Sequence, residues 1–337
     1  MALAGAPRQG GDRPLLVWAV SDGRTGIENQ ALGLAEALAR ITPAEVVRRH
    51  VRYQPLFERW PTALRLAPNA MLAEGLPRIE PPWPDVWIAT GRASLPFSLR
   101  MKRWSGGRTL IVQTQDPRAR LDRFDLVVAP EHDDLSGPNV LSITGSPNRI
   151  TPEQLKAEGT HWAERLDAMP GPRIACLIGG RSKSHDLSPE RARSLSAEIA
   201  GAVSSSGGSL MLTFSRRTPY EARAIITEAL SPLPGMIWDG SGDNPYFAFL
   251  GRADHILVTE DSANMAAEAA STGAPVHILR LERRGKADKF ARLHTDLERR
   301  GIARPLTLPL AHWTYEPLHE TDRAAREVLR LMLERAR

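Results

Sequence analysis

The stretch VTEDSANMAAEAASTGAPV, residues 258–276, decides the fold prediction for this chain. It continues an apolar run, HILVT at residues 255–259, through an acidic turn into a helix of small residues. The helix ends at Gly273, before Pro275 and a second apolar run. The predicted order is therefore strand, turn, helix and strand, and the alanine-rich helix can pack close against a sheet.

The acidic turn of this stretch is a candidate ligand site. Ser262 occupies the N-cap position, so the free backbone N–H groups of the first helical turn would face a phosphate beyond the strand end. Glu268 follows nearly two turns later and is placed to accept hydrogen bonds from sugar hydroxyls. Glu260 and Asp261 of the turn are grouped with this predicted nucleotide site. The alternative is an ordinary strand–helix unit, in which Ser262 only caps the helix and Glu268 is solvated.

Short apolar runs with β-branched residues recur along the chain, and each is typical of a strand covered on both faces. Polar or glycine-containing loops follow these runs, at the edge where ligands of open α/β sheets bind. Helical patterns separate the runs, so the sequence predicts an α/β fold with two doubly wound parallel sheets that face each other across a cleft. The main runs are Leu15–Val20, Asp85–Gly91, Thr109–Gln115, Phe124–Pro130, Arg173–Gly180 and Ser209–Ser215.

Two successive sets of strands imply two domains. We expect residues 14–164 to form the first domain and residues 165–319 the second, with a Pro/Gly linker that ends near Pro172. The last segment, residues 320–337, predicts a helix whose apolar residues form one face. We expect this helix to pack back on the first domain.

Composition bounds the class of protein. The chain has 337 residues, of which 42% are hydrophobic, enough for two α/β domains. No run is long and apolar enough to span a membrane, and the start, MALAGAPRQGGDRP, lacks the apolar core of a signal peptide. We therefore expect a cytoplasmic protein. The single cysteine, Cys176, lies in the apolar run IACLI, which favours a buried, unreactive thiol over a nucleophile.

The charge balance suits an anionic partner. Net charge is +5 at pH 7, and a nucleotide diphosphate, an acidic membrane surface or a nucleic acid would each fit it. No arginine-rich tail or RNA-binding motif is present, so we expect no nucleic acid. Residues 54–84 are rich in proline, with Phe57, Trp60 and Trp83 between the prolines. This segment forms either a membrane-facing or acceptor-side flap or part of an ordinary core.

Basic loops of the second half predict a phosphate site. Gly180, Arg181 and Lys183 follow one strand, and Ser215 and Arg216 follow the next strand along the chain. A diphosphate needs such a positive lining with many hydrogen-bond donors. The alternative is that these arginines are merely solvated. The clustering of glycine, serine and basic residues at strand ends favours the phosphate site.

Loops of the first half predict the acceptor side of the cleft. Removing a proton from an acceptor hydroxyl needs a carboxylate or a histidine; Asp22, directly after the first strand, is the first candidate and Glu28 the second. The alternative role of Asp22 is to cap the helix that begins near Gly26. Four further polar residues complete the predicted acceptor-side cleft: Arg92, Gln115, Asp116 and Asn244.

Several motifs are absent from the sequence. There is no GxGxxG pattern, and the strand-like EVVRRHVRY has no acidic residue at its end, which disfavours a dehydrogenase. There is no HxxxH, HExxH or DxD pattern, and His132 with Asp133 and Asp134 is the only compact His/Asp group, so we expect no metal site. The missing GxSxG and GxxxxGK[ST] patterns argue against α/β-hydrolases and P-loop enzymes.

Nine motifs occur in one order along the chain: SDGRTGIENQALGLAEAL, IATGRAS, QTQDPR, FDLVVAPEHD, GSPNR, GGRSKSHDL, TFSRRTP, DNPYFAFLGRAD and VTEDSANMAAEAASTGAPV. Together they resemble the mitochondrial-fission ELM-type family, which comprises the plant elongated-mitochondria protein and bacterial relatives treated as glycosyltransferases. The resemblance covers residues 14–335.

The resemblance implies a GT-B-like fold, with two Rossmann-like domains and the nucleotide sugar held on the C-terminal one. It also implies that no catalytic metal or other cofactor is needed. By the same resemblance, Ser262 contacts phosphate and Glu268 holds the ribose. SDGRTG stands where related lipid-linked sugar transferases have a GGH-type histidine, so the identity of the base is left open.

The function expected from these features is a metal-independent glycosyltransferase. It would move a sugar from a nucleotide-diphosphate donor to an envelope or lipid-linked acceptor, in the cytoplasm or peripherally on the inner membrane. One alternative is a non-catalytic adaptor that recruits a division dynamin to a membrane. Another is a sugar-nucleotide epimerase on the same scaffold.

Overall fold

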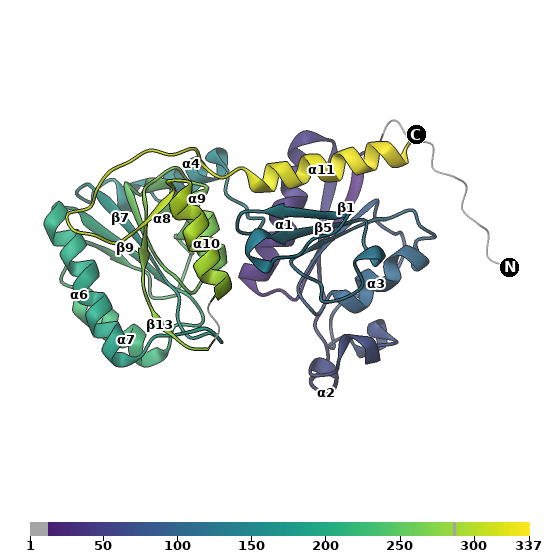
Figure 1. Cartoon of the computed structure of the whole chain (residues 1–337), viewed down its shortest axis with the longest axis horizontal. Coiled ribbons are helices and arrows are strands. Elements are labelled where there is room, and N and C mark those ends of the chain that lie inside the picture. Colours follow the sequence, from purple (N-terminus) through teal and green to yellow (C-terminus); the bar gives the residue numbers. More distant parts are fainter. Residues whose placement is uncertain (1–12, 286–287) are drawn as a thin grey trace.

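Two parallel six-stranded sheets lie side by side in the computed structural model, each covered by helices (Figure 1). The structure describes residues 13–285 and 288–337, so almost all of the N-terminal stretch used in the signal-peptide argument lies outside the described residues. The prediction of an α/β fold with two doubly wound parallel sheets is confirmed.

The first sheet has the strand order β2-β1-β3-β4-β5-β6, and all neighbouring strands are parallel. Its strands are β1 (Leu15–Ser21), β2 (Ala44–His50), β3 (Val86–Thr90), β4 (Leu110–Thr114), β5 (Leu126–Pro130) and β6 (Val140–Ile143). The helices of this half are α1 (Thr25–Ile41), α2 (Pro55–Glu58) and α3 (Leu95–Trp104), with 3-10 turns η1 (Thr62–Leu64), η2 (Pro68–Met71), η3 (Leu121–Arg123) and η4 (Glu131–Asp133).

The second sheet has the order β10-β9-β7-β11-β12-β14, again with all neighbours parallel. Its strands are β7 (Arg173–Ile178), β9 (Ser209–Phe214), β10 (Gly235–Ile237), β11 (His255–Thr259), β12 (Val276–Leu279) and β14 (Ala303–Pro305). β8 (His185–Asp186) and β13 (Glu282–Arg283) form a short antiparallel pair beside it. The helices are α4 (Pro152–His161), α5 (Ala163–Leu166), α6 (Pro189–Ser206), α7 (Tyr220–Leu230), α8 (Tyr246–Arg252), α9 (Ala263–Ala270), α10 (Asp288–Arg299) and α11 (Glu320–Arg335).

Burial explains why the strands are continuous apolar runs. Every residue of β3, β4, β5 and β11 is buried, because helices cover both faces of each sheet. Alternate strand residues therefore supply two cores per sheet: Val17 packs in one core of the first sheet and Trp18 in the other. The Cys176 thiol is buried in a core of the second sheet, and burial raises its pKa.

The helices at the two ends of the second half, α4 and α11, pack in the cores of different sheets. Ala324, Ala325 and Val328 of α11 are buried in the first-sheet core with residues of α1, so the last helix packs on the first half, as Figure 1 also shows. Conversely, Leu155 of α4 packs against the second-sheet core, and α4 contacts α8. By packing, α4 therefore belongs to the second half. The domain boundary at residues 164/165 stays a prediction.

Strand order locates one crevice in each sheet. In the first sheet the chain goes to opposite sides after β1, because β2 and β3 flank it; in the second sheet β9 and β11 flank β7 in the same way. Ligands of open parallel sheets bind at the carboxyl ends of the strands at such a reversal. The crevices lie between the loops after β1 and β3, and between the loops after β7 and β11.

Candidate functional site

A buried carboxylate joins three loops of the second-sheet crevice. Asp261 is fully buried, and its Oδ2 accepts hydrogen bonds from the backbone N of Gly180 (3.1 Å) and from the Arg217 guanidinium (2.7 Å). Its Oδ1 accepts from the Thr259 hydroxyl at 2.7 Å. The loops after β7, β9 and β11 therefore converge on Asp261, which the sequence predicts among the nucleotide-binding residues. In the structure, the role of Asp261 is to hold these three loops in position.

Two glycines permit this convergence. A Cβ on Gly179 would lie 1.9 Å from the Asp261 carboxylate, and a Cβ on Gly180 would lie 2.4 Å from the backbone oxygen of Arg217. Neither contact is sterically allowed, so the sequence GG is required for the first loop to reach the other two. The backbone N of Arg181 then donates to the Arg217 carbonyl at 3.0 Å.

Glu260, the neighbouring carboxylate, also points inward. It is 2% exposed, and its Oε1 accepts a hydrogen bond from the backbone N of Leu281 at 2.8 Å. Its Oε2 lies 3.6 Å from Arg280 and 3.8 Å from Arg283. Glu260 therefore connects the loop after β11 to the segment after β12, and its side chain is not open to solvent.

The cations predicted to bind phosphate lie on the solvent side of this arrangement. Arg181, Lys183 and Arg216 are exposed. Arg181 donates to Asp186 at 2.9 Å, an exposed pair that a phosphate would compete with readily because exposed ion pairs contribute little. Ser215 is half-buried in the same loop and accepts a hydrogen bond from the backbone N of Arg217 at 3.1 Å. The structure brings these predicted residues together at the edge of one crevice.

Ser262 caps α9 as its sequence position predicts. Its hydroxyl accepts a hydrogen bond from the backbone N of Met265 at 3.4 Å. This satisfies one of the free N–H groups of the first helical turn, which is the ordinary capping role. A role of Ser262 in phosphate binding stays a prediction.

Glu268 is buried where the two halves meet. It is 6% exposed, the Tyr246 hydroxyl donates to its Oε2 at 2.5 Å, and Asn29 of α1 is a second hydrogen-bond partner. Burial raises the pKa of Glu268 to about 7, against the opposing effect of these two hydrogen bonds. Burial likewise raises the pKa of Tyr246. The idea of a solvated Glu268 on a generic helix is therefore wrong.

Asn264 connects the two crevices directly. Its Nδ2 donates to the backbone oxygen of Gly26 at 2.7 Å, and its Oδ1 lies 3.2 Å from Gln30 and 2.8 Å from the Ser146 hydroxyl. Gly26, Gln30 and Ser146 belong to the first half, whereas Asn264 is in the first turn of α9. The start of α1 therefore lies against the start of α9, and a ligand beside this contact would touch both halves.

The two predicted catalytic carboxylates both have partners. Asp22 accepts from the backbone N of Arg24 at 3.1 Å and from its guanidinium at 2.8 Å. It does not cap α1, whose N-cap residue is Arg24. Glu28 lies 2.8 Å from Nε2 of His50, a half-exposed residue at the carboxyl end of β2. This pair has the geometry of a base oriented by a carboxylate.

The remaining predicted residues of the first half surround the same edge. Arg92 is exposed in the loop after β3. Gln115 follows β4 with φ of 68°, and Asp116 accepts from the backbone N of Arg118, whose φ is 48°. Left-handed conformations in two non-glycine residues indicate a strained loop, and such strain concentrates at functional sites. Asn244 lies instead in the second half, where its Oδ1 accepts from the backbone N of Tyr246 at 3.0 Å.

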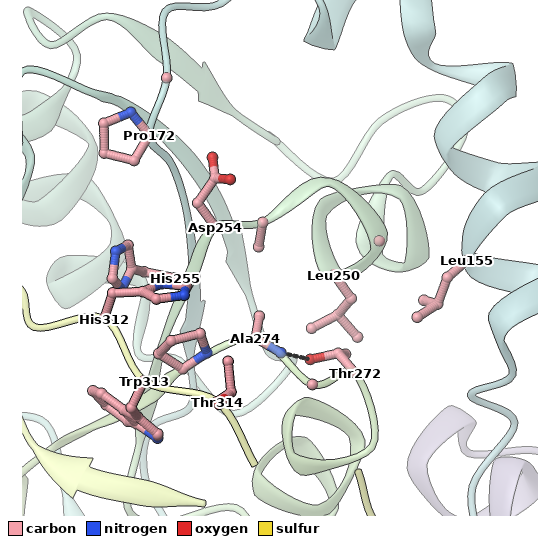
Figure 2. A pocket seen from close by; sticks show the side chains of 15 residues that line it. Leu155, Pro172, Leu250, Asp254, His255, Thr272, Ala274, His312, Trp313 and Thr314 are labelled. Atoms are coloured by element: carbon pink, nitrogen blue, oxygen red, sulfur yellow. Dashed lines mark hydrogen bonds between the residues drawn. The ribbon is translucent and has the colours of Figure 1, made fainter. Parts of the chain in front are cut away.

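A hollow of about 630 Å³ lies at the opposite edge of the second sheet. Figure 2 shows His255 and Trp313 among the side chains that line it, with Asp254 and Pro172 nearby. His255 begins β11 and Pro172 precedes β7, so the hollow faces the amino ends of these strands. We place the candidate site at the carboxyl edge, because the strand reversal, the cations and the paired acid–base groups are all there.

Within residues 13–285 and 288–337, no group of three or more His, Cys, Asp or Glu side chains is placed to hold a metal ion. No helix there is long and apolar enough to cross a membrane.

Sequence reasoning missed four residues of the site: Asn29, His50, Tyr246 and Asn264. Three of them lie within motifs that carried the family resemblance, SDGRTGIENQALGLAEAL, DNPYFAFLGRAD and VTEDSANMAAEAASTGAPV. Their position within these motifs is the feature of the sequence from which they could have been predicted. His50 had no such signal, since it ends an otherwise ordinary edge strand.

Comparison with known proteins gives a family match. The family model for mitochondrial fission ELM1 matches residues 25–332. The Mitochondrial fission protein ELM1 of Arabidopsis thaliana is 28% identical over 278 residues, which are 73% of this chain but only 64% of the plant protein. An uncharacterized protein of Rickettsia prowazekii is 25% identical over 366 residues, covering 94% of this chain and 98% of that protein.

Solved structures show the same fold. The UDP-GlcNAc 2-epimerase of Methanocaldococcus jannaschii, in complex with UDP-GlcNAc and UDP, has a TM-score of 0.55 and 13% identity, covering 94% of this chain and 99% of that chain. The corresponding enzyme of Neisseria meningitidis, bound to UDP-GlcNAc, has a TM-score of 0.51 and 12% identity, covering 95% of this chain and 100% of that one. The predicted GT-B-like arrangement of two Rossmann-like domains is confirmed as a fold.

Proposed function

The chain belongs to the mitochondrial fission ELM1 family, and from that premise we propose that it is a glycosyltransferase that uses a nucleotide-diphosphate sugar. The observation that carries the proposal is the meeting of two strand-reversal crevices through Asn264, with basic loops on one side and a histidine–carboxylate pair on the other. Envelope or lipid-linked molecules are the proposed acceptors.

On the donor side, the leaving diphosphate needs positive charge at its oxygens. Arg181, Lys183 and Arg216 are the proposed sources, because they are exposed on the converging loops. Ser262 and the first turn of α9 add hydrogen-bond donors. Glu268 is proposed to hold the ribose hydroxyls, which requires it to exchange Asn29 for the sugar. Donor binding would then loosen one contact between the halves.

On the acceptor side, a base must take the proton of the attacking hydroxyl. His50, oriented by Glu28, is the proposed base, and Asp22 is the second candidate. The acceptor oxygen forms a bond to the anomeric carbon as the bond from that carbon to the diphosphate oxygen breaks. The hydroxyl proton passes to His50, and the negative charge leaves with the diphosphate. The proposal requires no catalytic metal or other cofactor.

Isothermal titration with UDP, GDP, ADP and CMP sugars tests donor binding. Arg181→Ala and Arg216→Ala should each weaken binding of the preferred nucleotide roughly tenfold to a hundredfold, since each removes a charge-assisted hydrogen bond. Arg193→Ala, an exposed arginine of α6, is the matched control and should bind as wild type. If no nucleotide binds to wild type, the proposal is wrong.

A second candidate function is a sugar-nucleotide epimerase. The similarity in fold to two UDP-GlcNAc 2-epimerases over nearly the whole chain favours it. Incubation with the preferred nucleotide sugar and no acceptor separates the two functions: an epimerase yields the isomeric nucleotide sugar, whereas a transferase leaves it unchanged apart from slow hydrolysis.

A non-catalytic adaptor is the remaining candidate, and the name of the family favours it. In a deletion strain with a measurable defect, full complementation by Glu268→Ala and Arg181→Ala would support the adaptor and count against both enzymes. Loss of complementation by folded forms of these variants would support nucleotide use.

A further inference from the structure

Exposed hydrophobic side chains are concentrated in one short segment. Eight large hydrophobic side chains are exposed in the described part of the chain, and four of them lie between residues 56 and 66. Their exposed fractions are 72% for Leu56, 39% for Trp60, 55% for Leu64 and 72% for Leu66. Single exposed leucines are ordinary, but four within eleven residues form a patch that needs an explanation.

These side chains lie on a prominence, which we define as residues 54–72. It contains α2, η1 and η2, and Figure 1 shows α2 projecting from the first half, away from its sheet. Buried contacts hold it in place: Tyr53 pairs with Leu72, and the Arg65 guanidinium stacks on the Tyr53 ring at 4.1 Å. The apolar side chains are therefore presented outward by an ordered scaffold.

The same region carries the positive charge of the chain. Residues 48–108 contain 11 Lys and Arg but only 4 Asp and Glu, a net charge of +7, whereas the whole chain carries +5. Arg100 and Arg103 belong to α3, which contacts η1 of the prominence, and Arg59 lies between Leu56 and Trp60. Apolar side chains and unbalanced positive charge therefore occur together.

We propose that the prominence docks on an anionic lipid bilayer. Leucine and tryptophan side chains gain free energy on entering the boundary between head groups and acyl chains, and neighbouring arginines are attracted to anionic head groups. Either signal alone gives weak attachment, and the prominence combines both. A nucleic acid would use the arginines but not the exposed leucines, so a bilayer fits better.

Docking at this place would bring the bilayer to the first-half crevice. The Tyr53 hydroxyl, beside the prominence, donates to the backbone oxygen of Ala93 in the loop after β3 at 2.8 Å. The pKa of Arg24, in the loop after β1, is raised chiefly by its hydrogen bond with Asp22, and the charge of Glu58 on α2 adds to this effect, so α2 lies near that loop. A lipid-linked acceptor would thus be delivered to the acceptor side. This last step rests on the proposed function; docking itself does not.

A single labelled cysteine tests the contact. Cys176 is fully buried and burial raises its pKa, so a thiol-reactive environment-sensitive dye would label only an added cysteine. We expect the dye on Leu64→Cys to gain intensity and shift to the blue with vesicles of phosphatidylcholine and phosphatidylglycerol, and not with phosphatidylcholine alone. The matched control is Leu333→Cys, exposed on α11, which should not respond. Equal responses at both positions, or none at either, would overturn the proposal.

Vesicle co-sedimentation of unlabelled protein separates the contribution of the apolar side chains from that of the arginines. Leu56→Ser with Leu66→Ser, and separately Arg100→Gln with Arg103→Gln, should each lower the fraction bound to anionic vesicles at least about tenfold. Leu333→Ser and Arg193→Gln are the controls and should bind as wild type. Thermal melts identify variants that fail to fold. If a double variant fails to fold, vesicle binding is measured on its two single variants instead.

The assays contain no nucleotide, so their outcome is independent of the proposed enzyme activity. If wild-type protein stays in the supernatant in the presence of anionic vesicles, the bilayer proposal is wrong, even if the protein binds nucleotide sugars. Binding to single-stranded RNA that depends on Arg100 and Arg103 but not on Leu56 and Leu66, without vesicle binding, would assign the surface to nucleic acid instead.

Discussion

Glu268 shows how burial turns a polar residue into a pH-sensitive one. Its carboxylate lies at the contact between α9 and α1, with Tyr246 and Asn29 as hydrogen-bond partners. Because burial raises its pKa to about 7, the folded chain binds this proton more tightly than the unfolded chain, in which the pKa is near 4.5. Stability should therefore depend on pH between these two values.

The first prediction concerns this pH dependence. Wild-type free energy of unfolding should fall as pH rises from about 4.5 to about 7, by up to about 3 kcal/mol from this group, and then level off. Glu268→Gln keeps the size and an acceptor for Tyr246 but cannot titrate, so it should lose this decline. Urea unfolding at pH 5 and pH 8 measures the difference.

The exposed Glu190 on α6 provides the control: Glu190→Gln should keep the wild-type pH profile. A Glu268→Gln variant with the same decline as wild type would show that another group causes it.

The second prediction concerns a single close approach of backbone. Gly180→Ala would put a methyl group 2.4 Å from the Arg217 carbonyl oxygen, so the loops after β7 and β9 must separate. We expect a loss of about 1–3 kcal/mol in the free energy of unfolding, typical of overpacking, and, under the proposed function, weaker nucleotide binding. Gly171→Ala, whose Cβ meets no atom within 4 Å, should change stability by less than about 0.5 kcal/mol. Urea unfolding of both variants checks this, and equal losses would contradict it.

At the scale of elements, the carboxyl edge of the second sheet depends on residues that connect strands far apart in sequence. Asp261 at the end of β11 holds the loop after β7 through Gly180 and the loop after β9 through Arg217. Each strand forms in its place through its own apolar run, but the loops between strands and helices have no such run. A buried charge that accepts hydrogen bonds from several loops gives them a common position.

The third prediction follows for this connection. Asp261→Asn keeps the shape but removes the negative charge that Arg217 pairs with, so stability should fall by about 1–3 kcal/mol. Hydrogen exchange should quicken at the backbone N–H groups of Gly180 and Arg181 more than in the core of β7. Asp243→Asn, an exposed carboxylate in the same half, is the control. Uniform quickening over the whole sheet would indicate global destabilisation in place of the local effect.

At the scale of the whole molecule, the two halves are held by polar contacts as well as by chain connections. Asn264 binds the start of α1 and the loop after β6, and Gly145 approaches α9 so closely that a Cβ there would lie 2.5 Å from Ala267. The chain also returns to the first half at its end, where α11 packs in a core of the first sheet. The start of α1 and the loop after β6 therefore lie against α9 in this structure, and under the proposed function the halves would have to move apart to admit a donor.

The fourth prediction tests this closure. Asn264→Ala removes hydrogen bonds to Gly26, Gln30 and Ser146 while leaving both cores intact, so the halves should separate more often. Small-angle scattering should show a larger radius of gyration, and hydrogen exchange should quicken at residues 26–30. Asn244→Ala, exposed and bonded locally, is the control for both measurements. Unchanged scattering and exchange would mean that the other contacts suffice to keep the halves closed.

The sequence by itself determined the strands, their parallel arrangement and the loops at their carboxyl ends. Runs such as HILVT are local signals, because a strand buried on both faces must be apolar at every position. The Ser262 cap is equally local, since its hydrogen-bond partner is three residues away. The location of Gly180 and Arg181 at the carboxyl edge of the second sheet could be predicted because their loop directly follows a strand in the sequence.

Only the tertiary structure decided which way the polar side chains point and what they meet. Glu260 and Asp261 look like cleft residues in sequence, yet both are buried to hold loops. The partners of Glu268, Glu28 and Asn264 lie at least 22 residues away in the sequence. No local pattern records such pairs, because their free energy comes from burial and charge brought together only when the two sheets and α11 have packed.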